Sequence, residues 1–293
     1  MVRSRSFLFS EMQWVQLEAR TFWLVMAASF LVVAIWESLR PHRELSIPGE
    51  RRWSRHGLLL ILSGVTSVGI YRVGPVVVAA SMAHSRFGLF HQIALPYAVQ
   101  FVLAILLLDF VRYAVHCAEH HVPILWRMHQ VHHSDPDFDL STGARVHPIE
   151  TVLVQGATLG AVALLAPPVA AVLVVELVTC FQVFFAHANV SMPVGLEKFL
   201  RRVVVTPQMH RVHHSEDAAE QARNLSDIFP WWDHLFRTYL AAPSKGDAGV
   251  VMGMRGFQNT GSLDLGFMLL QPFRREPQSA ADPVVSQESS VRS

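Results

Sequence analysis

Three short histidine clusters are the part of this sequence best suited to chemistry. The first contains His116 and His120, and the stretches 129–133 and 210–214 both have the pattern H-x-x-H-H. Residues three and four apart lie on one face of a helix with Cβ atoms about 5–6 Å apart, so each cluster can direct several imidazoles at one point. Neutral imidazole binds zinc, copper, iron and nickel. The pattern therefore predicts a nitrogen-ligated metal site.

The number of histidines in these clusters favours two metal ions over one. Adjacent histidines on a helix diverge by about 100°, which lets one cluster serve two neighbouring ions. A single zinc ion takes about four ligands, and the clusters supply more. Ligand type and spacing alone do not name the ion. The eight histidines are His116, His120, His129, His132, His133, His210, His213 and His214.

The composition places this site in or beside a membrane. Of the 293 residues, 51% are hydrophobic and 16% are charged, whereas about 25% are charged in a typical soluble domain. The mean hydropathy is +0.31. A formal net charge of +1 gives no global field that would attract nucleic acid. Two cysteines are too few for a disulfide scaffold or an all-thiolate metal site.

Four apolar stretches are long enough for membrane helices, which need about 20 residues to cross. The second is interrupted near Gly74, and the fourth is broken by Pro167 and Pro168. Proline disfavours helix at the residue before it, so the fourth is expected to be a hairpin of two helices that need not cross fully. We expect an all-α integral membrane protein with about four to five membrane helices. The stretches are residues 22–39, 58–82, 93–115 and 151–185.

Basic residues between the spans predict the orientation of the chain. Short loops rich in Lys and Arg stay on the cytoplasmic side, and the segment 40–55 contains five arginines. Counting crossings from this segment puts all three histidine clusters on the cytoplasmic face of an inner or plasma membrane. We expect one membrane-embedded domain over residues 1–273. Residues 274–293 are polar, lack apolar periodicity and are expected to be a disordered tail.

The order and spacing of these motifs resemble those of the fatty acid hydroxylase and sterol desaturase superfamily. The resemblance covers about residues 109–239, and both H-x-x-H-H clusters belong to it. It also includes an R-x-H-P-x-E element at 145–150 and an H-x-N element at 187–189. The sequence departs from the usual family pattern at 224–226, without loss of a histidine.

The resemblance implies a membrane-bound di-iron oxygenase that uses O2 as co-substrate to hydroxylate or desaturate a lipid. It implies a helical membrane base and a cytosolic helical cap that holds the two metals. It also implies an external electron donor, of the ferredoxin or cytochrome b5 type with its reductase. Zinc is expected only as an adventitious replacement for iron. The ligands that the resemblance implies are His116, His120, His129, His132, His133, His187, His210, His213 and His214.

Five further residues are predicted to support these ligands, because a histidine that binds a metal usually donates its other ring N–H to a carboxylate or carbonyl. Asp109 lies about two helical turns before His116 and can share its helix face. Our hypothesis is that Asp109 accepts a hydrogen bond from a ligating histidine. The other candidates are His147, whose own status as a ligand stays open, and Glu150, Asn189 and Asp233.

Other functions share parts of this pattern. A carotenoid or alkane hydroxylase would apply the same chemistry to a different substrate. A zinc-dependent membrane hydrolase would use the histidines without electrons, but the sequence lacks an H-E-x-x-H motif. A non-catalytic metal-binding membrane protein would be expected to have polar residues in successive spans, and the first two spans contain few.

Overall fold

The computed structural model describes residues 10–257 and 260–274, and this part of the chain is helical. Among the described residues there is no named β-strand, only two isolated bridges, Pro41 with Val190 and Ser215 with Met252. The prediction of an all-α membrane protein is confirmed. The predicted tail lies, from residue 275 onward, outside the described residues.

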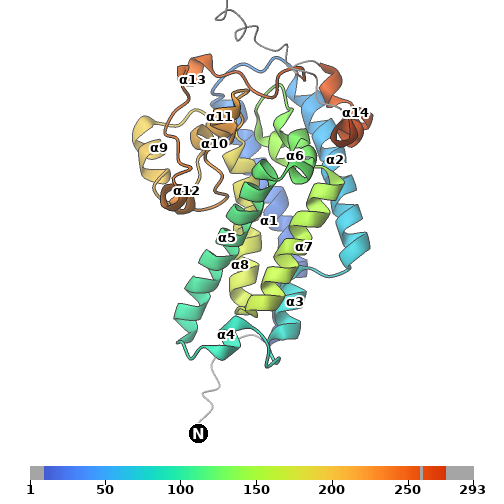
Figure 1. The fold of residues 1–293 in the computed structure, drawn as a ribbon, viewed down its shortest axis with the longest axis vertical. Helices are drawn as coiled ribbons and strands as arrows, with labels where there is room; N and C mark the ends of the chain where they lie inside the picture. The colour runs from blue at the N-terminus through green and yellow to red at the C-terminus, as the bar shows by residue number, and fades with distance from the viewer. Residues whose placement is uncertain (1–9, 258–259, 275–293) are drawn as a thin grey trace, which may run out of the picture.

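Five helical segments are long and apolar enough to cross a membrane. In Figure 1 they run side by side along the long axis of the molecule and carry a cap of shorter helices at one end. The first segment begins at Glu11, eleven residues earlier than its apolar stretch, because Ser10 caps the helix there. The five are α1 (Glu11–Leu39), α2 with α3 (Gly49–Tyr71 and Pro75–Met82), α5 (Tyr97–His121), α7 (Pro148–Leu165) and α8 (Val169–Ala186).

The two interruptions predicted from glycine and proline are present. Helix α2 ends at Arg72, which adopts a left-handed conformation with φ of 57°, and α3 starts at Pro75. Helices α7 and α8 are separated by Ala166, also left-handed with φ of 47°, and by two prolines. Each arm of this hairpin has 18 residues, which corresponds to about 27 Å. That length is close to the ~30 Å hydrocarbon thickness of a bilayer.

The loop between the first two spans is shorter than predicted. Helix α2 starts at Gly49, so the arginine-rich segment becomes the loop 40–48 followed by two turns of helix inside the cap. Arg51 and Arg55 are exposed on this helix, as expected of basic residues beside a membrane. Arg52, which lies between them on the same helix, is fully buried.

Helix α8 forms the centre of the bundle. In its most apolar window 61% of residues are buried, against 17–22% in the other four segments. Those four helices leave large apolar side chains exposed, for example Trp23, Ile61 and Val102. Extended apolar surfaces of this kind mark contact with lipid. The core around α8 is formed by Val76, Leu108, Val162, Val172 and Val175.

The cap is built from short helices, and two of them carry histidine clusters. Helix α6 (Pro123–His133) begins two residues after α5 ends, and α10 (Pro207–His213) begins after the capping residue Thr206. Both start with proline, which has the right φ for the first helical position and lacks an N–H that would need a partner there. The other elements are η1 (Leu140–Ala144), α9 (Val194–Leu200), α11 (Ala218–Gln221), α12 (Trp231–Phe236), α13 (Gly246–Gly249), η2 (Thr260–Leu263), α14 (Leu265–Leu270) and η3 (Gln271–Phe273), while α4 (Leu89–Gln92) lies at the opposite end.

Candidate metal centre

The structure brings all nine predicted ligand histidines together in two adjoining groups. In each group the nitrogens that could bind a metal lie within 4.8 Å of one another. The groups are in contact, since the rings of His133 and His214 stack with centroids 4.6 Å apart. The five-histidine group consists of His116, His120, His129, His133 and His213. The four-histidine group consists of His132, His187, His210 and His214.

Four helices converge to form the two groups. The end of α5, the C-terminal half of α6, the C-cap residue of α8 and α10 with its own C-cap residue each contribute at least one histidine. Each adjacent pair is divided between the groups: His132 and His133 separate, and so do His213 and His214. This division is what a divergence of about 100° between neighbouring side chains predicts.

Backbone carbonyls fix the orientation of three of these rings. The Nδ1–H groups of His116, His187 and His213 donate to the carbonyl oxygens of Leu225, Val183 and Arg223 at 2.8, 2.7 and 2.9 Å. A carbonyl oxygen only accepts, so the proton is on Nδ1 and the Nε2 lone pair is free. In this tautomer a histidine presents Nε2 to a metal.

The free nitrogens point at one another at distances that suit a shared cation. Nε2 of His187 lies 3.1 Å from Nε2 of His132 and 2.9 Å from Nε2 of His210. Nε2 of His116 lies 3.2 Å from Nε2 of His129. Ligands bound about 2.0–2.1 Å from one ion lie roughly 3 Å apart. Because lone pairs that face each other repel, this arrangement fits a bound metal in each group.

Carboxylates support the five-histidine group. Nδ1 of His129 lies 2.7 Å from Oε1 of Glu150, so the predicted contact between Glu150 and a ligand histidine is present. Oε2 of Glu119 lies 3.9 Å from the same nitrogen. Glu119 was missed in the sequence, although it lies between His116 and His120 on their helix. Its position one helical turn after His116 was the signal available.

The hypothesis for Asp109 is wrong. Its carboxylate accepts hydrogen bonds from the backbone N–H groups of Ile228 and Phe229 at 3.1 and 3.2 Å and from Nε1 of Trp232 at 2.8 Å. Seven residues along a helix return to the same face but also advance about 10 Å, which is beyond hydrogen-bonding reach of a ring at His116. Asp109 therefore fastens the loop before α12 to the membrane helix α5.

Asp233 supports the ligand His116 indirectly. It accepts from the N–H groups of Leu225 and Ser226 at 2.8 and 3.0 Å. The Leu225 carbonyl is the acceptor for His116, so Asp233 holds the loop that orients this ring.

Asn189 and His147 do not contact the two groups. Asn189 bonds the backbone of Arg43 through both ends of its amide. His147 caps helix α7, where its Nδ1 accepts from the N–H of Ile149 at 3.1 Å. Among the described residues, His147 belongs to neither histidine group.

Burial keeps the cap histidines neutral. Desolvation lowers the pKa of His187 to about 4. It also holds the pKa values of His132, His210 and His214 well below 6.5, and neighbouring histidines lower them further. Neutral imidazole is the form that binds metal ions. The neutral state of these imidazoles therefore agrees with the arrangement of their nitrogens around one shared point.

Known proteins resemble the chain over this same region. Residues 101–238 match the fatty acid hydroxylase family. Ornithine lipid hydroxylase OlsE of Rhizobium tropici is 29% identical over 271 residues, which cover 87% of this chain and 76% of that protein. No solved structure gives a significant match.

Two further relatives share a shorter region. Alkylglycerol monooxygenase of Homo sapiens is 31% identical over 157 residues, covering 54% of this chain and 33% of that protein. The corresponding protein of Danio rerio is 32% identical over 161 residues, covering 53% of this chain and 34% of that protein. The chain thus spans about a third of the length of these two relatives. All nine grouped histidines fall within the segment, residues 101–238, that matches the fatty acid hydroxylase family.

Proposed function

We propose that this protein is an integral membrane oxygenase that binds two iron ions and hydroxylates a C–H bond of a lipid with O2. The observation that carries the proposal is the convergence of nine imidazoles, seven of them buried and two half-buried, in two adjoining groups at one end of a membrane bundle. Hydroxylation is favoured over desaturation because the relatives are named as a hydroxylase and as monooxygenases.

The residues of the chain would hold and orient the metals. The five-histidine group would bind one ion and the four-histidine group the other. Two bound irons would supply the activation of O2 and the oxidation of an unactivated C–H bond. The carbonyls of Leu225, Val183 and Arg223 keep the donor nitrogens aimed at the ions, and Glu150 increases the basicity of His129. Burial of the rings excludes water from the site.

The substrate class follows from where the metals lie and from what the relatives act on. One relative is named for ornithine lipid and two for alkylglycerol. We propose a polar membrane lipid as substrate, and ornithine lipid as the first to test. Such a lipid would enter sideways from the bilayer rather than through water.

The base of the cap beside α5 is suited to contact the bilayer surface. Trp231, Leu235 and Phe236 of α12 are 43%, 65% and 50% exposed. The ring of Phe236 stacks on Phe110 and Tyr113 of the membrane helix α5, with centroids 5.8 and 5.5 Å apart. Exposed aromatic residues at this level are typical of the membrane–water interface.

The proposal places the metal groups on the cytoplasmic side of the inner or plasma membrane. Arg40, Arg51 and Arg55 are exposed at the cap end of α1 and α2, which agrees with that orientation. Reduction of O2 would need electrons from an external donor of the ferredoxin or cytochrome b5 type with its reductase.

The test compares two adjacent histidines. The protein is purified without oxygen in lipid nanodiscs, and bound iron is measured by elemental analysis and Mössbauer spectroscopy. Consumption of O2 is followed with ornithine lipid and an electron donor of the ferredoxin type with its reductase present, and the product is examined for an oxygen atom derived from isotopically labelled O2. His120→Ala is expected to abolish iron binding and product, whereas His121→Ala is expected to retain both, because His121 is exposed and lies outside the two groups.

Two results would contradict the proposal. One is wild-type protein that binds iron but incorporates no labelled oxygen into any lipid of a total membrane extract. The other is oxygen-independent lipid cleavage with zinc bound, which would indicate the hydrolase alternative.

A further inference from the structure

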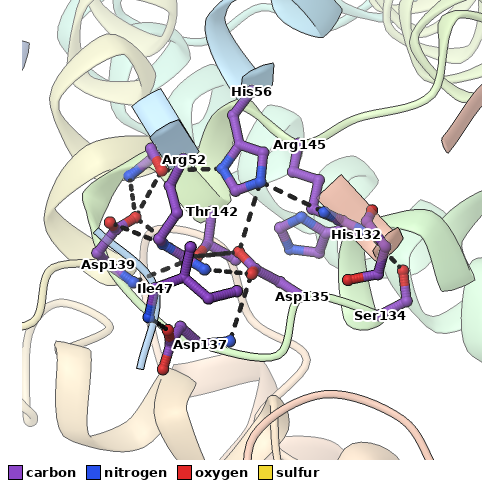
Figure 2. Close-up of polar contacts among 12 residues, drawn as sticks. Ile47, Arg52, His56, His132, Ser134, Asp135, Asp137, Asp139, Thr142 and Arg145 are labelled. Atoms are coloured by element: carbon purple, nitrogen blue, oxygen red, sulfur yellow. Dashed lines mark hydrogen bonds and ion pairs between the residues drawn. The ribbon is translucent and has the colours of Figure 1, made fainter. Parts of the chain in front are cut away.

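A buried network of charged side chains connects helix α2 to the segment that follows the histidines of α6 (Figure 2). Arg52 comes from α2, and Asp135, Asp139 and Arg145 come from the segment 134–145. All four residues are at most 1% exposed. Two guanidinium groups and two carboxylates balance one another in charge. Arg52 lies outside the region that matches the family.

Arg52 binds two carboxylates of the segment 134–145. Its Nη1 and Nη2 donate to the two carboxylate oxygens of Asp135 at 2.5 and 2.7 Å, and its Nε donates to Asp139 at 3.0 Å. The hydroxyl of Thr142 also donates a hydrogen bond to the carboxylate of Asp135, at 2.7 Å. A paired contact between a planar guanidinium and a carboxylate fixes direction as well as distance. Asp135 follows the ligand His133 by only two residues.

Arg145 holds both sides of the adjacent histidine pair. Its Nε donates to the carbonyl of Val131 at 2.7 Å, and its Nη2 donates to the hydroxyl of Ser134 at 2.9 Å. Val131 and Ser134 are the residues directly before and after His132 and His133. In Figure 2, Arg145 and Ser134 lie beside the ring of His132. The pair matters because it supplies one ligand to each histidine group.

The same segment also abuts a third ligand. Helix η1 packs so closely on α8 that a Cβ added at Gly143 would lie 2.3 Å from the carbonyl oxygen of Val183 and 2.9 Å from Nδ1 of His187. These two atoms form the hydrogen bond that orients His187. The network thus determines the placement of η1, and η1 lies against the ring of His187.

We infer that Arg52 is a positioning residue for the metal centre, acting through Asp135 and Asp139 on the ligands His132, His133 and His187. A buried ion pair contributes little net stability, because the cost of desolvation offsets the attraction, and apolar replacements are often neutral or stabilising. Unlike apolar packing, the network of hydrogen bonds and ion pairs fixes the geometry of the segment 134–145, which lies between ligand residues. The inference rests on the proposed binding of two metal ions.

The experiment measures metal geometry without catalysis. Full-length protein in nanodiscs is titrated with Co2+, whose visible absorption reports the number and arrangement of its ligands. Arg52→Lys keeps the charge but replaces the fork with a single ammonium group. We expect it to weaken Co2+ binding about 10-fold, as is typical when support of a ligand is lost, and to change the absorption bands. Arg51→Lys, on the exposed side of the same helix, is the matched control and should match wild type.

The outcomes separate the inference from the proposed function. Arg52→Lys protein with wild-type Co2+ affinity and absorption bands would overturn the inference, even if its melting temperature fell. If Arg52→Lys does not fold, Asp139→Asn decides: it keeps the paired contact of Arg52 with Asp135 but removes the charge that the Nε of Arg52 meets, and unchanged bands in this variant would overturn the inference. Altered bands in either variant, with Arg51→Lys unchanged, would support it. Wild-type protein that fails to bind two Co2+ ions would refute the proposed metal centre itself.

Discussion

Replacement of Gly143 by alanine tests the contact between η1 and the ligand His187. Gly143 does not have a positive φ, so alanine can adopt its backbone conformation and the effect is purely steric. The new Cβ would lie 2.3 Å from the Val183 carbonyl oxygen, and ordinary contact begins at 3.4 Å, so η1 and α8 must separate by about 1.1 Å. No flexible side chain can absorb this shift, because the nearest atom belongs to the backbone.

Two effects of Gly143→Ala are expected. Overpacking of this kind costs about 1–3 kcal/mol of folding free energy. Displacement of Val183 and His187 also weakens the hydrogen bond between them, so metal affinity should fall about 10- to 100-fold.

The assay combines a thermal melt in nanodiscs with the Co2+ titration, and it has a matched control. A Cβ at Gly160 of α7 would meet nothing within 4 Å. Gly160→Ala should therefore leave metal binding unchanged and stabilise the helix by about 0.5–1 kcal/mol. Wild-type stability and Co2+ affinity in Gly143→Ala would refute the argument that η1 sets the position of His187.

Three further predictions address the surroundings of the metal groups. Glu150→Gln replaces the carboxyl group that contacts Nδ1 of His129 by an amide, so metal affinity should fall about 10-fold in the Co2+ titration; unchanged affinity would show that the carboxyl group does not support this ligand. Asp109→Asn should destabilise the cap by about 1–3 kcal/mol in a thermal melt and leave the metal content of the folded protein unchanged. Loss of metal without loss of stability would instead support the hypothesis that Asp109 accepts a hydrogen bond from a histidine. The pKa of His187 is lowered from 6.5 to about 4 by burial, so between these values the unfolded chain binds more protons than the folded one. The contribution of His187 to the stability of the metal-free protein should therefore be fully present above pH 6.5 and be lost as the pH drops toward 4. If the melting temperatures of wild type and His187→Ala differ by the same amount at both ends of this range, the burial of this ring is contradicted.

Much of the metal centre could be predicted from local sequence patterns. The histidine clusters obey the helical period, so the spacing alone shows which rings can share a face. The division of His132 from His133, and of His213 from His214, follows from the same period. Proline and glycine marked the breaks at Gly74 and at residues 166–168, because their effects act on the local backbone.

Support of the ligands was harder to predict, because it depends on contacts between distant segments. Asp109 shares a helix face with His116, but its carboxylate is used by backbone N–H groups more than a hundred positions later in the chain. The acceptors for His116 and His213 are backbone carbonyls, which carry no sequence signal.

Local patterns in the chain were enough to predict a helical membrane protein with eight clustered histidines suited to two metals. Hydrophobicity and helical period act between near neighbours, so a single sequence displays them. How the helices pack sets the rest: five histidines face one point and four another, Glu119 joins Glu150 at His129, and Arg52 is buried. The partner Asp135 lies 83 positions from Arg52. Such a pairing is created when the chain folds back on itself, and no local pattern records it.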